Sequence, residues 1–140
     1  MICLDTNAVI AVISGRSPSV RIRLEAALTE NEQITVPAIV LFELWFGIAK
    51  SQRVEANIRA LDAFLSKGFD VLPFDAQDAR EAGDIRAALA VSGMPIGPYD
   101  VLIAAQARRR NARLITANGR EFVRVPRLTM EDWAMPITGS

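Results

Sequence analysis

The chain has 140 residues, of which 51% are hydrophobic and 23% charged, a composition that indicates one folded domain and excludes a disordered or low-complexity protein. Its 16 Lys and Arg balance 16 Asp and Glu, and no apolar run is long enough to span a membrane, so we expect a cytoplasmic protein with a single domain over residues 1–140. The absence of histidine excludes Ser-His-Asp triads, histidine-ligated zinc and imidazole acid-base catalysis, while a single cysteine, Cys3, excludes an internal disulfide.

The first apolar stretch, residues 2–4, predicts a short buried strand that ends at Asp5. Open α/β sheets bind ligands at the carboxyl ends of their strands, so Asp5 is a candidate site residue. The same aspartate would also cap the helix predicted from Ala8 to Ile13, and capping is the more common role of an aspartate at such a place. Both interpretations remain open on this stretch alone.

The next part of the chain contains an unusually apolar helix. A helix over residues 19–28 precedes a strand over 34–36, and Pro37 suits the first turn of a helix over 38–49. This helix is apolar on nearly every side, so we expect the domain or a partner to bury it on several faces. Its one acid, Glu43, predicts either an ion pair with an arginine or a metal ligand.

The following elements are predicted to be structural. Residues 54–65 have the period of an amphipathic helix, and residues 69–73 form a strand candidate. Asp75 is placed to cap a helix that runs to about Ala90 and turns Ala79 toward the core.

The last third of the chain brings a second informative stretch. Pro98 and Asp100 both suit the first turn of a helix that continues to Arg110, since a helix N-terminus favours proline and acids. A strand over 112–116 then ends in a polar cluster, residues 117–122. After it we expect an edge strand and a terminal turn, from residues 123–125 and 128–133.

Alternating strands and helices predict an α/β fold of three layers, α/β/α, with a central, mostly parallel sheet of four to five strands. Because the carboxyl ends of parallel strands share one edge, the acids that follow the strands are able to converge there. The oxygen donors concerned are Asp5, Glu43, Asp100, and Asn118 or Glu121. Carboxylates grouped without histidine or lysine favour a hard divalent cation, Mg²⁺ or Mn²⁺.

The motifs Leu4-Asp5-Thr6-Asn7, Pro95-Ile96-Gly97-Pro98-Tyr99-Asp100 and Leu114-Ile115-Thr116, with Glu43 in the apolar helix and Asn118 and Glu121 near the end, occur in this order along the chain. As an ordered set they resemble a PIN domain, in particular the VapC toxins of bacterial type II toxin-antitoxin pairs. The resemblance implies a Mg²⁺-dependent endoribonuclease that leaves a 5′-phosphate and a 3′-hydroxyl, and some close relatives cut a tRNA anticodon loop. It also implies a cognate antitoxin, and assembly into a homodimer or a higher toxin-antitoxin complex.

The resemblance also suggests roles for individual residues. Asp5, Glu43 and Asp100 match the three family acids, and the fourth ligand is Asn118 or Glu121, which leaves one or two bound ions as alternatives. Asp5 and Asp100 are expected to hold the principal ion, with Glu43 and Glu121 contacting it through water or holding a second one, while a bound water attacks phosphorus in line. Hydrogen bonds that orient the ligands are expected from Thr6, Asn7 and Thr116.

The end of the chain is rich in arginine, which suits binding to the RNA backbone, although solvated arginines on a surface helix are the common alternative. The candidates are Arg108, Arg109, Arg110, Arg113 and Arg120.

Three other classes of protein fit these residues less well. A phosphatase of the haloacid dehalogenase type needs a second aspartate where this chain has Asn7. A flavodoxin-like domain would need a glycine-rich phosphate turn, which is missing. A non-catalytic PIN-like module that binds RNA or protein is the stronger alternative, and Glu43, an acid in an apolar helix, argues against it.

Overall fold

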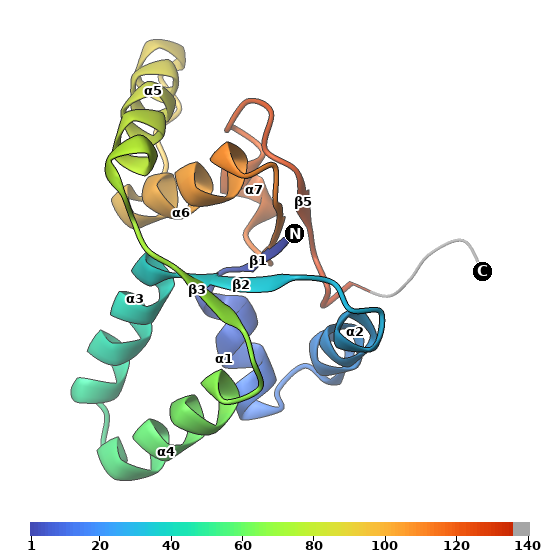
Figure 1. Ribbon diagram of the computed structural model, residues 1–140. Coiled ribbons are helices and arrows are strands. Elements are labelled where there is room, and N and C mark those ends of the chain that lie inside the picture. Colours follow the sequence, from blue (N-terminus) through green and yellow to red (C-terminus); the bar gives the residue numbers. More distant parts are fainter. Residues whose placement is uncertain (136–140) are drawn as a thin grey trace.

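The computed structural model describes residues 1–135 and places a parallel sheet between two layers of helices (Figure 1). The strands are β1 (Ile2–Leu4), β2 (Ile34–Pro37), β3 (Asp70–Leu72), β4 (Arg113–Ile115) and β5 (Met130–Glu131). The helices are α1 (Thr6–Ser14), α2 (Pro18–Thr29), α3 (Ala38–Ala49), α4 (Val54–Leu65), α5 (Ala76–Ser92), α6 (Pro98–Arg109) and α7 (Gly119–Phe122). The predicted α/β fold with a four- to five-stranded parallel sheet is confirmed.

The order of the strands creates a switch point beside β1. The sheet has the order β3-β2-β1-β4-β5, and every pair of neighbours is parallel. The chain therefore runs outward from β1 to β3 and then crosses to β4 on the other side of β1. At such a reversal the connections leave in opposite directions, which opens a crevice at the carboxyl ends of the two central strands, and ligands bind in this crevice.

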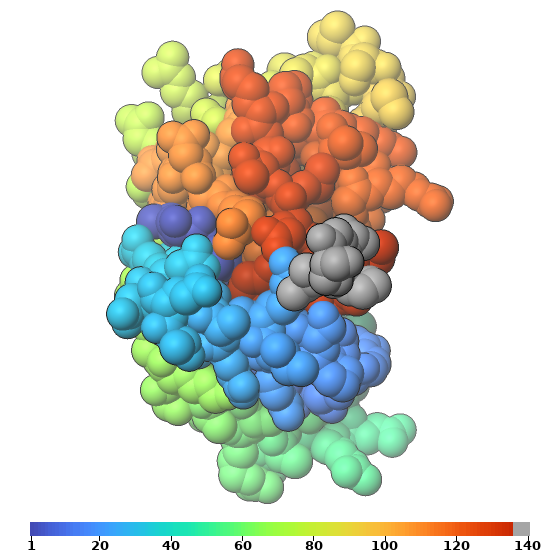
Figure 2. Space-filling model, turned by 90° about the vertical axis from the view of Figure 1, so that its right-hand side faces the viewer, coloured from blue at the N-terminus to red at the C-terminus, as the bar shows by residue number. Residues whose placement is uncertain are grey.

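The two helical layers differ in where they come from in the chain. Helices α1 to α4 lie on one side of the sheet, and α5, α6 and α7 lie on the other (Figure 1). Viewed from the side, the C-terminal segment, coloured red, runs over the layer of α5, α6 and α7 down to the middle of the molecule (Figure 2). Since both faces of β1 are covered, all three of its residues are buried, and Cys3 is a small buried side chain whose Sγ lies 3.1 Å from the hydroxyl of Thr35.

Several local predictions are wrong. Residues 123–125 form turns rather than an edge strand, which is β5 instead, and the polar cluster contains the short helix α7. Pro37 ends β2 in an extended conformation and precedes the helix instead of entering its first turn. In α5, Ala79 is exposed, whereas Asp78 is buried.

The apolar helix α3 is not buried on several faces by its own domain. Its only fully buried residues are Val40 and Leu44, while Phe42 and Phe46 leave 50% and 59% of their surface exposed. The alternative, a partner that covers α3, remains a prediction. None of the helices in residues 1–135 combines the length and apolar character that crossing a bilayer requires.

Candidate active site

Asp5 lies at the switch point and both caps a helix and belongs to the site. Its backbone N–H donates to the carbonyl of Ile115 in β4 at 3.1 Å, so the residue extends the central pair of strands. Its Oδ1 accepts the N–H of Ala8 at 2.8 Å, which caps α1, as predicted. Only 4% of the residue is exposed, so one carboxylate oxygen satisfies the helix while the charge remains in a buried place. The two interpretations of Asp5 are therefore compatible.

Glu43 reaches the same place from α3. The hydroxyl of Thr6, the first residue of α1, donates to Glu43 Oε1 at 2.9 Å. Within residues 1–135 Glu43 has no ion pair with an arginine, which is one of the two partners that its position in an apolar helix predicts. The hydroxyl of Thr6 therefore orients the carboxylate without neutralising it.

Asp100 and Glu121 occupy equivalent positions, each as the third residue of a helix that follows a turn. The charge of Glu121 contributes to the raised pKa of Asp100, which places the two carboxyl groups close to one another. Asn118 donates its Nδ2–H to Glu121 Oε2 at 3.3 Å and thus contacts the acid group directly. Helix α6 and the turn before α7 therefore bring Asp100, Glu121 and Asn118 together.

The electrostatics show that the acids share one region. Burial, followed by the charges of Glu43, Glu121 and Asp5, raises the pKa of Asp100 to about 6. Burial also raises the pKa of Asp5, followed by the charge of Glu43, although hydrogen bonds from Thr116 and Ala8 oppose the shift. Each carboxylate thus feels the negative charge of the others. A site of this kind is typical of functional groups rather than of structural ion pairs.

A fifth acid at the site, Asp132, is absent from the sequence-based set. It raises the pKa of Asp5 by its charge, which places it near the switch point. It follows β5 directly, just as Asp5 follows β1. An acid directly after a strand is a signal that the sequence offers, but residues 128–133 do not by themselves predict a strand that ends just before Asp132.

The carboxylate oxygens of this group suit a hard divalent cation, but in their present conformations the side chains do not surround a metal site. Oxygen ligands from carboxylates are those that Mg²⁺ and Mn²⁺ prefer, and an added cation would relieve the repulsion that raises the pKa of Asp100. Among residues 1–135, no three acidic or cysteine side chains are grouped closely enough to hold a metal ion. Binding would require these side chains to move closer together, and the glutamates among them, Glu43 and Glu121, have flexible side chains.

The residues expected to orient the ligands fare differently. Thr6 donates to Glu43, and the hydroxyl of Thr116 opposes the pKa shift of Asp5 while accepting the N–H of Asn118 at 2.9 Å. Asn7 is exposed and makes none of the side-chain hydrogen bonds found among residues 1–135.

The structure does not bring most of the predicted RNA-binding arginines to the acids. Arg108, Arg109 and Arg110 lie at the end of α6 opposite Asp100, and Arg113 begins β4 at the other edge of the sheet. All four are held by acids of the same chain. Arg120, next to Glu121 in α7, is exposed and is the member of the set that lies by the site.

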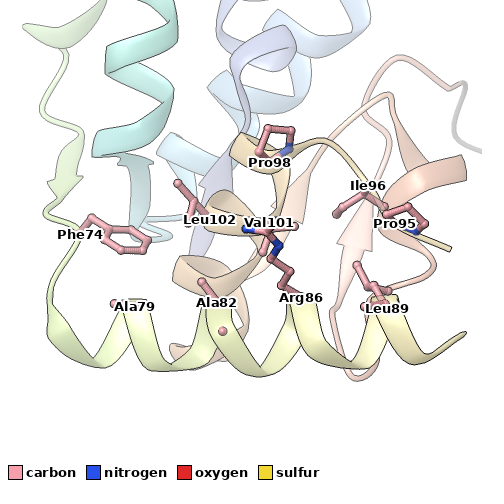
Figure 3. Close-up of a pocket in the computed structure, with 12 residues that line it drawn as sticks. Phe74, Ala79, Ala82, Arg86, Leu89, Pro95, Ile96, Pro98, Val101 and Leu102 are labelled. Carbon is pink, nitrogen blue, oxygen red and sulfur yellow. The ribbon is translucent and has the colours of Figure 1, made fainter. Parts of the chain in front are cut away.

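A large cavity in the part of the chain that the structure describes is separate from the acids. It has a volume of about 730 Å³ and lies between α5 and α6, lined by apolar side chains such as Phe74 and Leu102, with Arg86 as a cation (Figure 3). A smaller cavity of about 400 Å³ adjoins the site and is lined by Thr6 and Glu43. Of these two cavities, the smaller one is therefore the better candidate for binding a substrate, because Glu43 lines it.

Comparison with known proteins agrees with this geometry. Residues 2–128 match the PIN domain family. This chain belongs to the PIN-domain family. Its relatives include the tRNA(fMet)-specific endonuclease VapC of Shigella flexneri, which is 41% identical over 94% of this chain and 96% of that protein. Ribonuclease VapC2 of Rickettsia felis is 39% identical over 93% of this chain and 96% of that protein.

Solved structures extend the relation of this PIN domain to toxin-antitoxin complexes. The structure of VapBC2 from Rickettsia felis bound to a DNA fragment from its promoter matches with a TM-score of 0.88 at 38% identity, over 95% of this chain and 99% of that one. DNA-bound VapBC from Salmonella typhimurium matches with a TM-score of 0.86 at 38% identity over the same shares. PIN-domain ribonucleases are in general metal-dependent enzymes.

Proposed function

We propose that this PIN domain is a VapC-type toxin, a metal-dependent endoribonuclease that an antitoxin protein holds inactive. The observation that carries the proposal is the convergence of Asp5, Glu43, Asp100 and Glu121 at the switch point, without a counter-ion from residues 1–135. Relatives over almost the full length are ribonucleases, and the solved relatives are toxin-antitoxin complexes.

Mg²⁺ is the cation we propose, with Mn²⁺ as its substitute. Asp5 and Asp100 would hold the principal ion, and Glu43 and Glu121 would contact it through water or hold a second one. When bound, such an ion supplies a nucleophilic water at neutral pH and positive charge for the phosphoryl oxygens. Asn118 would contribute a neutral amide oxygen, or would orient Glu121 as it does now.

The chain's own groups prepare this site. Thr6 and Ala8 hold Glu43 and Asp5 by hydrogen bonds that leave other carboxylate oxygens free to bind. Asp100 must lose its proton before it can act as a ligand, and its pKa of about 6 means that it is mostly ionised at neutral pH. The rate of cleavage should therefore fall as the pH decreases through 6.

The substrate and partners belong to the same proposal. One relative is specific for tRNA(fMet), so a tRNA is the first substrate to test. The antitoxin partner follows from the VapBC complexes, and the homodimer, the cytoplasmic location and a single domain over residues 1–140 stay predictions.

The test is to map new RNA ends in total cellular RNA after incubation with the purified chain, with Mg²⁺ and with EDTA. We expect Mg²⁺-dependent cleavage at few sites by the parent and none by Asp5→Ala, whose fold is checked by circular dichroism. Equal cleavage by the variant and the parent would contradict the proposal. A binding module without catalysis would give no Mg²⁺ or Mn²⁺ isotherm in titration calorimetry.

A further inference from the structure

Two exposed aromatic residues adjoin the acids. Phe42 precedes Glu43 in α3, and Tyr99 precedes Asp100 in α6. Their rings lie 5.3 Å apart between centroids at an angle of 58°, with 50% of Phe42 and 45% of Tyr99 exposed. Two helices on opposite sides of the sheet thus present aromatic surface to solvent at the very place where their acids meet.

The aromatic surface continues along α3 and ends in a cation. Phe46 lies one helical turn after Phe42 and Lys50 one turn further, so all three share one face of the helix. The ammonium of Lys50 lies 4.7 Å from the centroid of the Phe46 ring. Together with Thr6 and Glu43, these side chains line the cavity of about 400 Å³ beside the acids. We name Phe42, Phe46, Tyr99 and Lys50 the aromatic shelf.

The chemistry of the shelf selects its occupant. A second protein packed here would bury the carboxylate of Glu43, whose only hydrogen bond within residues 1–135 comes from Thr6. A nucleotide would place a base against the rings and a phosphate near Lys50, and its scissile phosphate would face the acids with their cation. Every base has a π-face, so such stacking tolerates many sequences, and the position of Lys50 beyond the rings complements the backbone charge.

We propose that the aromatic shelf stacks an unpaired base of the RNA next to the bond that is cleaved, and that Lys50 contacts the adjoining phosphate. The inference rests on the proposed ribonuclease function and refines its substrate class. Bases inside a duplex are stacked on both sides and cannot offer a face to Phe42 or Tyr99, so the shelf selects single-stranded RNA or a loop.

The test compares two labelled probes with the same backbone: a short oligoadenylate strand and a strand of equal length made of abasic ribose units. Binding to the full chain is measured by fluorescence anisotropy in EDTA, which prevents cleavage. We expect the parent to prefer the strand with bases, and Phe42→Leu to weaken binding of that strand by about 5- to 30-fold while leaving the abasic strand unchanged. Leucine keeps apolar area but has no π-face, and Phe42→Tyr should restore the preference.

Substitution of Lys50 provides a second, independent test. Lys50→Ala should weaken both probes alike and reduce the dependence of log Kd on log salt concentration by about one unit. The matched controls are Lys67→Ala, which removes the other lysine of the chain, and Val91→Ala, which truncates a side chain that is 91% exposed in α5. Neither control should change the binding of either probe.

Each outcome decides the inference. Equal binding of the two probes by the parent, or equal loss of both in Phe42→Leu, would overturn it. A shift of Phe42→Leu to a smaller oligomer in light scattering, with unchanged preference for bases, would assign the surface to a second copy and would also overturn it. The proposed function is judged separately by Mg²⁺-dependent cleavage. A parent that cleaves RNA but binds both probes equally would support the function and contradict base stacking. A parent that prefers the strand with bases but cleaves no RNA would support base stacking and contradict the function.

Discussion

Asp100 shows that a functional residue can be identified because its ionised form lowers the stability of the fold. Its pKa of about 6 lies above the ordinary value of 3.8 because the group is partly buried and faces other acids, so an ionised Asp100 destabilises the folded chain. Asp78 is the contrast. Burial alone would raise its pKa, but the hydrogen bonds and charge of Arg110 hold that pKa below its usual value. The charge of Asp100 therefore has to be balanced by a bound cation, whereas that of Asp78 is balanced by Arg110 of the same chain.

Asp100→Asn should therefore be more stable than the parent in EDTA at pH 7.5, by roughly 2–5 °C in unfolding temperature, and should lose at least about 100-fold in cleavage rate. Mg²⁺ should raise the unfolding temperature of the parent and have little effect on the variant, because a ligand stabilises only the state that binds it. Thermal unfolding with and without Mg²⁺ measures both. A variant less stable than the parent in EDTA would mean that Asp100 has a structural role.

Arg110→Met should destabilise the chain by about 2–4 kcal/mol, because the buried Asp78 loses the guanidinium that lies 2.8 Å from its Oδ1. The pair lies at the end of α6 remote from Asp100, so the metal-dependent cleavage of the folded variant should equal that of the parent. Urea unfolding gives the first quantity and cleavage at low temperature the second. Loss of cleavage without loss of stability would instead return Arg110 to the RNA-binding set.

At the scale of elements, the helices show which sequence signals are reliable. Asp75 caps α5 as predicted, accepting the N–H of Asp78 at 2.9 Å, and Asp78 completes a capping box by accepting the N–H of Asp75 at 3.0 Å. Helix α3 was predicted from composition to be buried on several faces by the domain or a partner, and within the domain its aromatic side chains Phe42, Trp45 and Phe46 are exposed. A cap depends on residues three apart in the chain, whereas burial depends on which neighbours arrive from elsewhere.

Helix α5 also offers a clean test of its own energetics. Gly83 lies in its interior, and a Cβ added there would meet nothing within 4 Å. Gly83→Ala should raise the free energy of unfolding by about 0.5–1 kcal/mol, because alanine has less backbone freedom to lose. Urea unfolding measures the change. A decrease in stability would indicate that another chain packs closely over this part of α5.

At the scale of the whole molecule, the acids couple stability to pH. In the absence of metal, the raised pKa of Asp100 adds stability that is fully present below pH 3.8 and is lost as the pH rises through about 6. Asp78 acts in the opposite sense, since the stability from its lowered pKa is lost as the pH falls. The parent curve therefore mixes both effects, and a matched comparison is needed.

The difference in unfolding temperature between Asp100→Asn and the parent isolates the site. It should be smallest near pH 4, grow as the pH rises through 6, and stay level above that, when measured in EDTA. Added Mg²⁺ should shrink the difference at pH 7.5. A difference that is independent of pH would show that the carboxylate is not held near other negative charges.

The sequence by itself predicted the class of fold and the caps at Asp5 and Asp75, because periodicity and turn residues are local properties. It also proposed a set of oxygen donors, Asp5, Glu43, Asp100, and Asn118 or Glu121, because acids and the absence of histidine can be counted. Only the tertiary structure decided which polar groups face one another. It paired Arg108 to Arg110 with acids of α5, turned Asn7 outward, brought Asp132 to the site, and left Phe42 and Tyr99 exposed beside it. The physical reason is that partners distant in the chain are chosen by the order of strands in the sheet, and the reversal beside β1 is not encoded in any single stretch.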